Sequence, residues 1–142
     1  MLSSFWCNET YRKCIPTQNN IIIAIRYKES NKGKVYRMDR SPSEEIKQEL
    51  LSWKGVTVHE HNFVTIIFYV NGIEMGHLHG DSIADIQFPA KVSKKLVKEG
   101  YVSPHHIIPK SGWVSHEIQN ARDVKEVIEL FRFQYDRLVE SK

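Results

Sequence analysis

Long apolar runs are absent from this sequence. The longest, residues 63–70, contains Thr65 and is too short for a helix that crosses a bilayer, which needs about 20 residues. Residues 1–13 lack the apolar centre of a secretory leader, and residues 21–25 form only a short apolar run. The sequence therefore predicts a soluble, cytoplasmic protein with no membrane partner.

Cysteine is scarce, and familiar catalytic motifs are missing. The chain has 2 cysteines, Cys7 and Cys14, and their spacing differs from the C-x-x-C pattern of redox and metal sites. Without a leader that directs export, we expect both to be reduced thiols. The sequence also contains no P-loop, dinucleotide-binding, nucleophile-elbow or zinc-protease signature. No single motif therefore identifies a reaction.

An excess of charge is also lacking. The net charge is +3, and the lysines at positions 91, 94, 95 and 98 have no aromatic side chains interleaved among them. We therefore expect no nucleic-acid partner.

The bulk composition is typical of one globular domain. The chain has 142 residues, of which 41% are hydrophobic and 26% charged. Residues 1–40 are predicted to form an N-terminal extension with one or two strands, at residues 21–27 and 35–38. Residues 41–142 form the main domain. The oligomeric state stays open.

Helix and strand signals are clear from residue 41 onward. Ser41-Pro42-Ser43-Glu44 is a capping box with proline at the first helical position, and Asn120 is predicted to cap the last helix. Strands are predicted at residues 56–61, 63–70, 73–79, 83–88 and 113–118, and a further helix at residues 89–100. This order predicts an α+β fold, with an antiparallel or mixed sheet of about five to six strands and about three helices packed on it.

Asn71-Gly72 predicts a two-residue hairpin turn, because both positions tolerate a positive φ. An unbroken register from this turn pairs Phe68 with Met75, Ile66 with His77, and Val64 with His79. Both histidines would then lie among apolar side chains on one face. We therefore expect a histidine cluster in an apolar cavity, where an unpaired charge is costly.

His77 and His79 are the most informative residues. Side chains alternate along a strand, so the two rings point the same way, roughly 7 Å apart. Imidazole titrates close to neutral pH and is a common metal ligand. Asp85 stands in an otherwise apolar run and needs a polar partner. A hydrogen bond from a histidine would satisfy it, fix one tautomer and raise the basicity of the ring.

Pro104-His105-His106 supplies a second pair of histidines. Pro104 and Pro109 predict an extended segment over residues 101–109. Neighbours in an extended segment point in opposite directions, so we expect only one of His105 and His106 to join the site. His59 and His61 are expected to be solvated, and no role is assigned to His116.

Several short motifs together resemble those of the luciferase-domain family. They are Gly76-His77-Leu78-His79-Gly80-Asp81, Ala84-Asp85, Phe88-Pro89, Pro104-His105-His106 and Ser111-Gly112-Trp113-Val114-Ser115. The resemblance covers residues 45–138. The family includes the fungal luciferases and many small bacterial proteins without an assigned reaction.

The resemblance implies an expectation for the chemistry. Fungal luciferases are oxygenases that act on a hydroxylated pyrone with molecular oxygen, and the family implies no organic cofactor or metal for that step. Their pattern corresponds to Glu74, His77, His79 and His105. We expect this chain to lack their membrane anchor, and it has Tyr101 where they have tryptophan. Luminescence is therefore not implied.

Three hypotheses follow. The first is a small-molecule-binding domain with cofactor-independent oxygenase-type chemistry, in which His77, His79, Asp85 and His105 are catalytic and Glu74, Asp81, His106 and Trp113 contact the ligand. The second is a divalent-metal site that uses His77, His79, His105 or His106, and a carboxylate. The third is a non-catalytic binding or structural module in which the histidines are polar core residues. The sequence leaves open whether the protein is an enzyme.

Overall fold

The elements of the protein are seen in a computed structural model that describes residues 11–16, 22–26 and 40–141. In chain order they are β1 (Tyr11–Pro16), β2 (Ile22–Arg26), α1 (Pro42–Leu51), β3 (Val56–His61), β4 (Thr65–Val70), β5 (Ile73–His79), β6 (Ile83–Gln87), α2 (Ala90–Lys98), β7 (Ser103–Pro104), β8 (Trp113–Glu117) and α3 (Ala121–Glu140). The strand predicted at residues 35–38 and the thiols of Cys7 and Cys14 lie outside this description.

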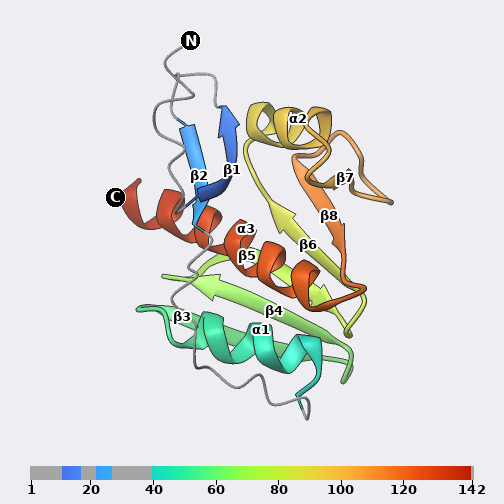
Figure 1. Cartoon of the computed structure of the whole chain (residues 1–142). Helices are drawn as coiled ribbons and strands as arrows, with labels where there is room; N and C mark the ends of the chain where they lie inside the picture. Colours follow the sequence, from blue (N-terminus) through green and yellow to red (C-terminus); the bar gives the residue numbers. More distant parts are fainter. Residues whose placement is uncertain (1–10, 17–21, 27–39, 142) are drawn as a thin grey trace.

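One six-stranded antiparallel sheet forms the centre of the domain (Figure 1). Its strand order is β3-β4-β5-β6-β8-β7, while β1 and β2 pair separately. The helix α3 crosses β4, β5, β6 and β8, with α1 beside it against β3 and α2 against β7 and β8. The predicted α+β class is confirmed. Among the described residues, the structure contains no helix with the length and apolarity needed to cross a membrane.

Both predicted helix caps are present. The Ser41 hydroxyl accepts a hydrogen bond from the Glu44 N–H at 3.3 Å, and Asn120 Oδ1 accepts from the N–H groups of Arg122 and Asp123 at 2.9 and 3.0 Å. Each cap satisfies backbone donors that have no partner within the helix. These local signals place α1 and α3 where the sequence predicts them.

The core lies between one face of the sheet and the helices α1 and α3. Phe68 and Phe131 are fully buried, and their rings meet edge to face with centroids 5.3 Å apart. Other buried members of this cluster include Ile46, Leu50, Val70, Leu78, Ile86, Val114 and Val127. The opposite face of the sheet carries both polar and apolar side chains, since His77 pairs with Ile67 and His79 with Ile83.

The predicted hairpin forms, but its predicted register is wrong. Asn71 and Gly72 have φ values of 51° and 79°, and Val70 pairs with Ile73 as expected. A bulge then shifts the pairing, so that Phe68 lies opposite Gly76 rather than Met75. His77 consequently pairs with Ile67, and His79 with Thr65.

Gly76 gives a physical reason for this bulge. A Cβ atom at this position would lie 2.4 Å from the Asp85 carbonyl oxygen and 3.0 Å from Cε1 of Phe131. The extra residue of the bulge places Gly76, the one β5 residue without a side chain, beneath α3. It also turns the next residue, His77, to the face opposite the helices.

The apolar environment predicted for the histidines is therefore also wrong. Phe68 and Met75 are fully buried in the core, whereas Val64 is exposed. His77 and His79 lie on the other face, with side chains 19% and 41% exposed. The strand predicted from residue 63 begins only at Thr65, because Asn62 and Phe63 have positive φ values and form a turn.

Candidate functional site

A polar row crosses the face of the sheet that points away from α1 and α3. His77 on β5 pairs directly with Asp85 on β6, and Asp85 pairs with Ser115 on β8. Directly paired residues project to the same face. Antiparallel pairing therefore brings together three polar side chains from distant parts of the chain.

Asp85 is the centre of the cluster. Its Oδ2 lies 2.9 Å from Nε2 of His79, 3.3 Å from Nε2 of His105 and 3.4 Å from Nε2 of His77. Its Oδ1 accepts a hydrogen bond from the Ser115 hydroxyl. The carboxylate is fully buried, so these donors replace the water that it loses on folding.

The charged form of Asp85 is strongly favoured. Burial by itself raises the pKa of this carboxyl, but hydrogen bonds from His77 and Ser115 and the favourable electrostatic interaction with His105 and His77 outweigh it and lower the pKa to about 2. Asp85 is therefore a permanent anion at neutral pH. It can hold imidazole rings in place, but it is too weak a base to take a proton from a ligand.

His77 lies between two carboxylates. Its Nδ1 is 3.1 Å from Glu74 Oε1, and its Nε2 faces Asp85. Burial lowers the pKa of this imidazole, but the hydrogen bonds to Asp85 and Glu74 outweigh burial, and the net pKa is raised above 6.5. Both ring nitrogens have an acceptor, which favours the imidazolium form.

The tautomer of His105 is set by the backbone. Its Nδ1 accepts hydrogen bonds from the N–H groups of Ile107 and Ile108, at 3.1 and 3.3 Å. Nδ1 therefore carries a lone pair, and the ring proton is on Nε2, where it points to Asp85. His105 is buried, so the loop after β7 holds this ring as a fixed donor.

His79 is the most exposed ring of the cluster. Its Nε2 lies nearest to Asp85, and since the carboxylate only accepts, Nε2 donates. In the neutral ring, Nδ1 then carries a lone pair. Within residues 40–141, no hydrogen bond or ion pair engages this nitrogen. An accessible acceptor backed by a buried anion is the arrangement of a general base.

Aromatic rings border the cluster. Trp113 lies 5.1 Å from His77 between ring centroids, and the ring of His106 stacks on that of His105 at 4.6 Å, with 17° between their planes. The prediction that His105 and His106 point in opposite directions is wrong. Strand β7 ends at Pro104, so strand alternation does not apply beyond it. His106 also lies 6.5 Å from His79 between centroids.

Asp81 lies apart from these contacts. Its Oδ1 accepts a hydrogen bond from the Ser43 N–H at 2.9 Å, in the first turn of α1. Hydrogen bonds from the Ser43 hydroxyl and N–H lower the pKa of this carboxyl. The structure ties Asp81 to the start of α1, and its predicted contact with a ligand stays a prediction.

Sequence reasoning assigned no role to two polar residues of β8. The register of β8 against β6 cannot be derived from a turn, so the contact of Ser115 with Asp85 was not predicted. Its neighbour His116 projects to the opposite face of the sheet and reaches α3, where Nε2 lies 3.1 Å from Glu126 Oε2. His116 and Glu126 form a second polar cluster with Asp123.

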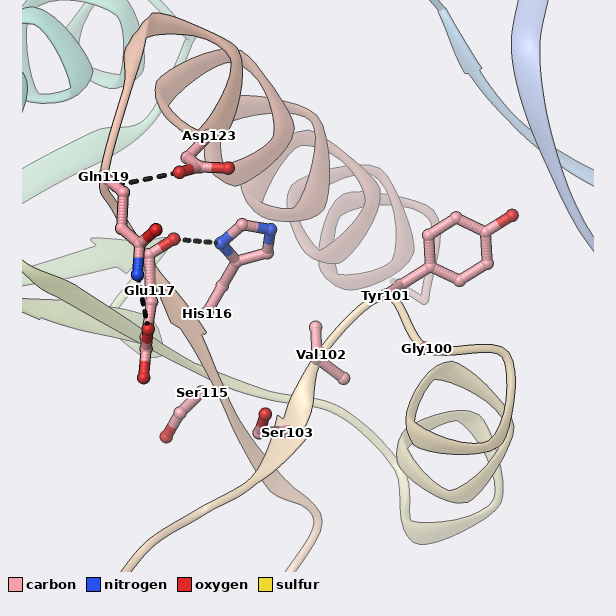
Figure 2. A pocket seen from close by; sticks show the side chains of 9 residues that line it. All are labelled: Gly100, Tyr101, Val102, Ser103, Ser115, His116, Glu117, Gln119 and Asp123. Carbon is pink, nitrogen blue, oxygen red and sulfur yellow. Dashed lines mark hydrogen bonds between the residues drawn. The ribbon is translucent and has the colours of Figure 1, made fainter.

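A hollow of about 350 Å³ lies beside this second cluster (Figure 2). Its walls come from the segment that joins α2 to β7, from the end of β8 and from the first turn of α3, and include Tyr101, Ser103, Ser115, His116, Gln119 and Asp123. The short strand β7 pairs only with Val114 and Ser115. The end of β8, at His116 and Glu117, extends beyond this pairing and borders the hollow.

Two sets of residues have the donors and the proximity that a metal ion requires. His77, Asp85 and His105 each offer one ligand atom, and these atoms lie within 4.8 Å of one another; His116, Asp123 and Glu126 do the same. In the first set, however, Nε2 of His105 carries a proton. A neutral imidazole binds metal through its unprotonated nitrogen, so this tautomer does not fit a metal ligand.

Comparison with known proteins supports the resemblance found in the sequence. Residues 72–134 match the family model described as the luciferase domain. The matched segment runs from the hairpin turn before β5 into α3 and contains all four members of the Asp85 histidine cluster, namely His77, His79, Asp85 and His105. No curated protein and no solved structure gives a significant match.

Proposed function

We propose that this protein binds an acidic small molecule, an enol or a phenol, and that His79 takes up its proton. The observation that carries this proposal is the hydrogen bond from His79 Nε2 to Asp85 at 2.9 Å, which leaves Nδ1 as the basic nitrogen of a partly exposed ring. The buried carboxylate fixes the tautomer and stabilises the imidazolium that forms. General-base assistance of this kind contributes about 10²–10⁴ in rate.

A second charge favours the deprotonated ligand. The ring of His77 lies 4.8 Å from that of His79 between centroids, and hydrogen bonds to Asp85 and Glu74, which raise its pKa against the effect of burial, favour its cationic form. A cation beside the base stabilises an anion that forms there. Trp113 and His106 add flat surfaces against which a planar ligand can pack.

The luciferase-domain match favours a use for this proton transfer, namely the reaction of the deprotonated ligand with dioxygen. Once the O–H proton has left, the enolate or phenolate has a nucleophilic carbon whose electron pair can form a C–O bond with dioxygen. The peroxide anion that results recovers the proton from His79, so that one ligand and one O₂ give one hydroperoxide and the base is regenerated. Asp85 holds the base through both transfers. In this proposal the protein needs no organic cofactor.

The divalent-metal hypothesis for the same histidines is less well supported. It requires His105 to offer a lone pair at Nε2, and the two backbone N–H groups at Nδ1 oppose this tautomer. The third hypothesis, in which the histidines are polar core residues of a non-catalytic module, can be distinguished from the proposed function because His79 is partly exposed. A ring that is 41% exposed contributes less to packing than a core residue, so a replacement that keeps a donor for Asp85 should leave stability almost unchanged.

The variant His79→Gln tests the proposal. Its side-chain amide keeps a donor near the Nε2 position for Asp85 but has no basic nitrogen. The probes are 4-hydroxy-6-methyl-2-pyrone and 4-nitrophenol, each compared with its non-acidic methyl ether. The wild-type protein should bind the acids as anions, detected by absorbance and NMR titration, and should bind the ethers more weakly. His79→Gln should lose about 10–100-fold in affinity, the value of one charge-assisted hydrogen bond.

The control variant is His59→Gln, at an exposed position of β3. It should bind both acids like the wild-type protein, and the melting temperatures of all three proteins should agree. Equal binding of acids and ethers would contradict the proposal, as would full affinity in His79→Gln. A variant that binds normally but melts at a much lower temperature would support the structural hypothesis instead.

A further inference from the structure

The hydrogen bonds of His116 fix one tautomer. Its Nδ1 lies 2.7 Å from the backbone carbonyl oxygen of Glu117, which can only accept, so Nδ1 donates. In the neutral ring, Nε2 then carries a lone pair. A histidine that binds a metal ion typically donates its other N–H to a carbonyl or carboxylate oxygen in this way.

The unprotonated nitrogen of this tautomer, Nε2, faces a second acceptor, the carboxylate of Glu126. Nε2 of His116 lies 3.1 Å from Oε2 of Glu126, and two lone pairs at this distance repel unless a cation lies between them. That cation is either a proton or a metal ion. Two donors of one tetrahedral Zn²⁺ site lie about 3.3 Å apart, which is close to the observed separation.

Asp123 provides the third donor. The ligand atoms of His116, Asp123 and Glu126 lie within 4.8 Å of one another, and all three residues are partly buried. One oxygen of each carboxylate is held by a neighbour, since Gln119 N–H donates to Asp123 Oδ2 at 2.8 Å and Arg122 Nε to Glu126 Oε1 at 3.2 Å. Such contacts orient the carboxylates of a metal site.

We propose that His116, Glu126 and Asp123 bind one divalent transition-metal ion beside the hollow between β8 and α3. The three side chains have the nitrogen and oxygen donors that Zn²⁺ and similar ions prefer. The hollow of about 350 Å³ leaves room for water or a small ligand at further coordination positions (Figure 2). Three protein ligands with an open position are the arrangement of a metal site that can bind or activate a substrate.

This site is separate from the Asp85 cluster. Ser115 and His116 are neighbours on β8 and project to opposite faces of the sheet, so Ser115 bonds Asp85 while His116 bonds Glu126. The two clusters also differ in their tautomers. In His105 the proton is on Nε2, the nitrogen that faces Asp85. In His116 the proton is on Nδ1, and the unprotonated Nε2 faces Glu126. The metal site therefore does not depend on the function proposed for His79.

The test is Zn²⁺ binding to the full chain, purified without a nickel column and measured by titration calorimetry and with a fluorescent competitor. The key variant is His116→Asn, whose amide can still donate to the Glu117 carbonyl but has no ligand at the Nε2 position. Glu126→Gln is the second variant. The controls are His79→Gln, in the Asp85 cluster, and His59→Gln, at an exposed position.

We expect one Zn²⁺ per chain, with affinity at least 100-fold weaker in His116→Asn and Glu126→Gln and unchanged in both controls. Loss of an outer contact of a metal site typically costs 10–100-fold, so loss of a ligand should cost no less. In the wild-type protein, Zn²⁺ should also shift the imidazole NMR signals of His116, a readout that does not require the variants to fold.

The absence of stoichiometric binding would overturn the proposal and identify the cation as a proton. Binding that is lost in His79→Gln and kept in His116→Asn would also overturn it and place the metal at the Asp85 cluster.

Discussion

Asp85 is the residue on which the arrangement of the histidines depends. The sequence pointed to it because a carboxylate in an apolar strand must have a partner. It also correctly grouped Asp85 with His77, His79 and His105. The sequence could not predict that one oxygen faces three imidazoles, because His105 reaches it from a loop whose path is set by hydrogen bonds to Ile107 and Ile108.

The lowered pKa of Asp85 predicts a specific dependence of stability on pH. A carboxyl whose pKa is about 2 in the folded protein and 3.8 in the unfolded chain stabilises the fold above pH 3.8, and this contribution is lost as the pH falls from about 4 to about 2. The difference corresponds to about 2 kcal/mol in the free energy of unfolding. Urea unfolding of wild type and Asp85→Asn at pH 5 and pH 2 measures it.

The free energies of unfolding of wild type and Asp85→Asn should differ by about 2 kcal/mol less at pH 2 than at pH 5. Glu140→Gln, near the end of α3, is the matched control and should follow the wild-type curve at both pH values. If the difference between wild type and Asp85→Asn stays constant over this range, the histidine cluster does not hold Asp85 in its charged form.

Strand β5 shows how far element-scale prediction reaches. Asn71-Gly72 correctly predicted the turn, and strand alternation correctly placed His77 and His79 on one face. The face itself was wrong, because a single inserted residue reverses it. The insertion places Gly76 where the Asp85 carbonyl of β6 and Phe131 of α3 leave no room for a side chain, and because both lie further along the chain, no local pattern could reveal it.

The close packing around Gly76 predicts the effect of Gly76→Ala. The added methyl would lie 2.4 Å from the Asp85 carbonyl oxygen, so β5 and β6 must separate or α3 must move. We expect a loss of about 3 kcal/mol in the free energy of unfolding, at the upper end for overpacked sites. Thr57→Ala, at an exposed position of β3, should change it by less than about 0.5 kcal/mol. Urea unfolding checks both values, and a Gly76→Ala protein as stable as wild type would contradict the role given to this glycine.

At the scale of the whole molecule, the sheet carries most of the apolar packing on one face and the Asp85 cluster on the other, while the proposed metal site lies on the packing face, where His116 meets α3. Its inner face holds the apolar core against α1 and α3, and its outer face carries the row that contains Asp85. The order of helices and strands predicted this α+β architecture, because capping residues, prolines and the hairpin turn are local signals. The strand β1 was not predicted, because residues 1–20 are polar and mixed and show no clear apolar period. The strand β8 was predicted without its register, because pairing between strands distant in the chain has no local signature.

The central claim of this account is the position of the protons on the histidines around Asp85. The most direct measurement is a long-range ¹H–¹⁵N NMR spectrum of the imidazole rings of the full chain at neutral pH. We predict that His105 and neutral His79 carry their proton on Nε2 and that His77 is protonated on both nitrogens. A neutral His79 with its proton on Nδ1 would contradict the account, because its basic nitrogen would then face Asp85 and could not reach a ligand.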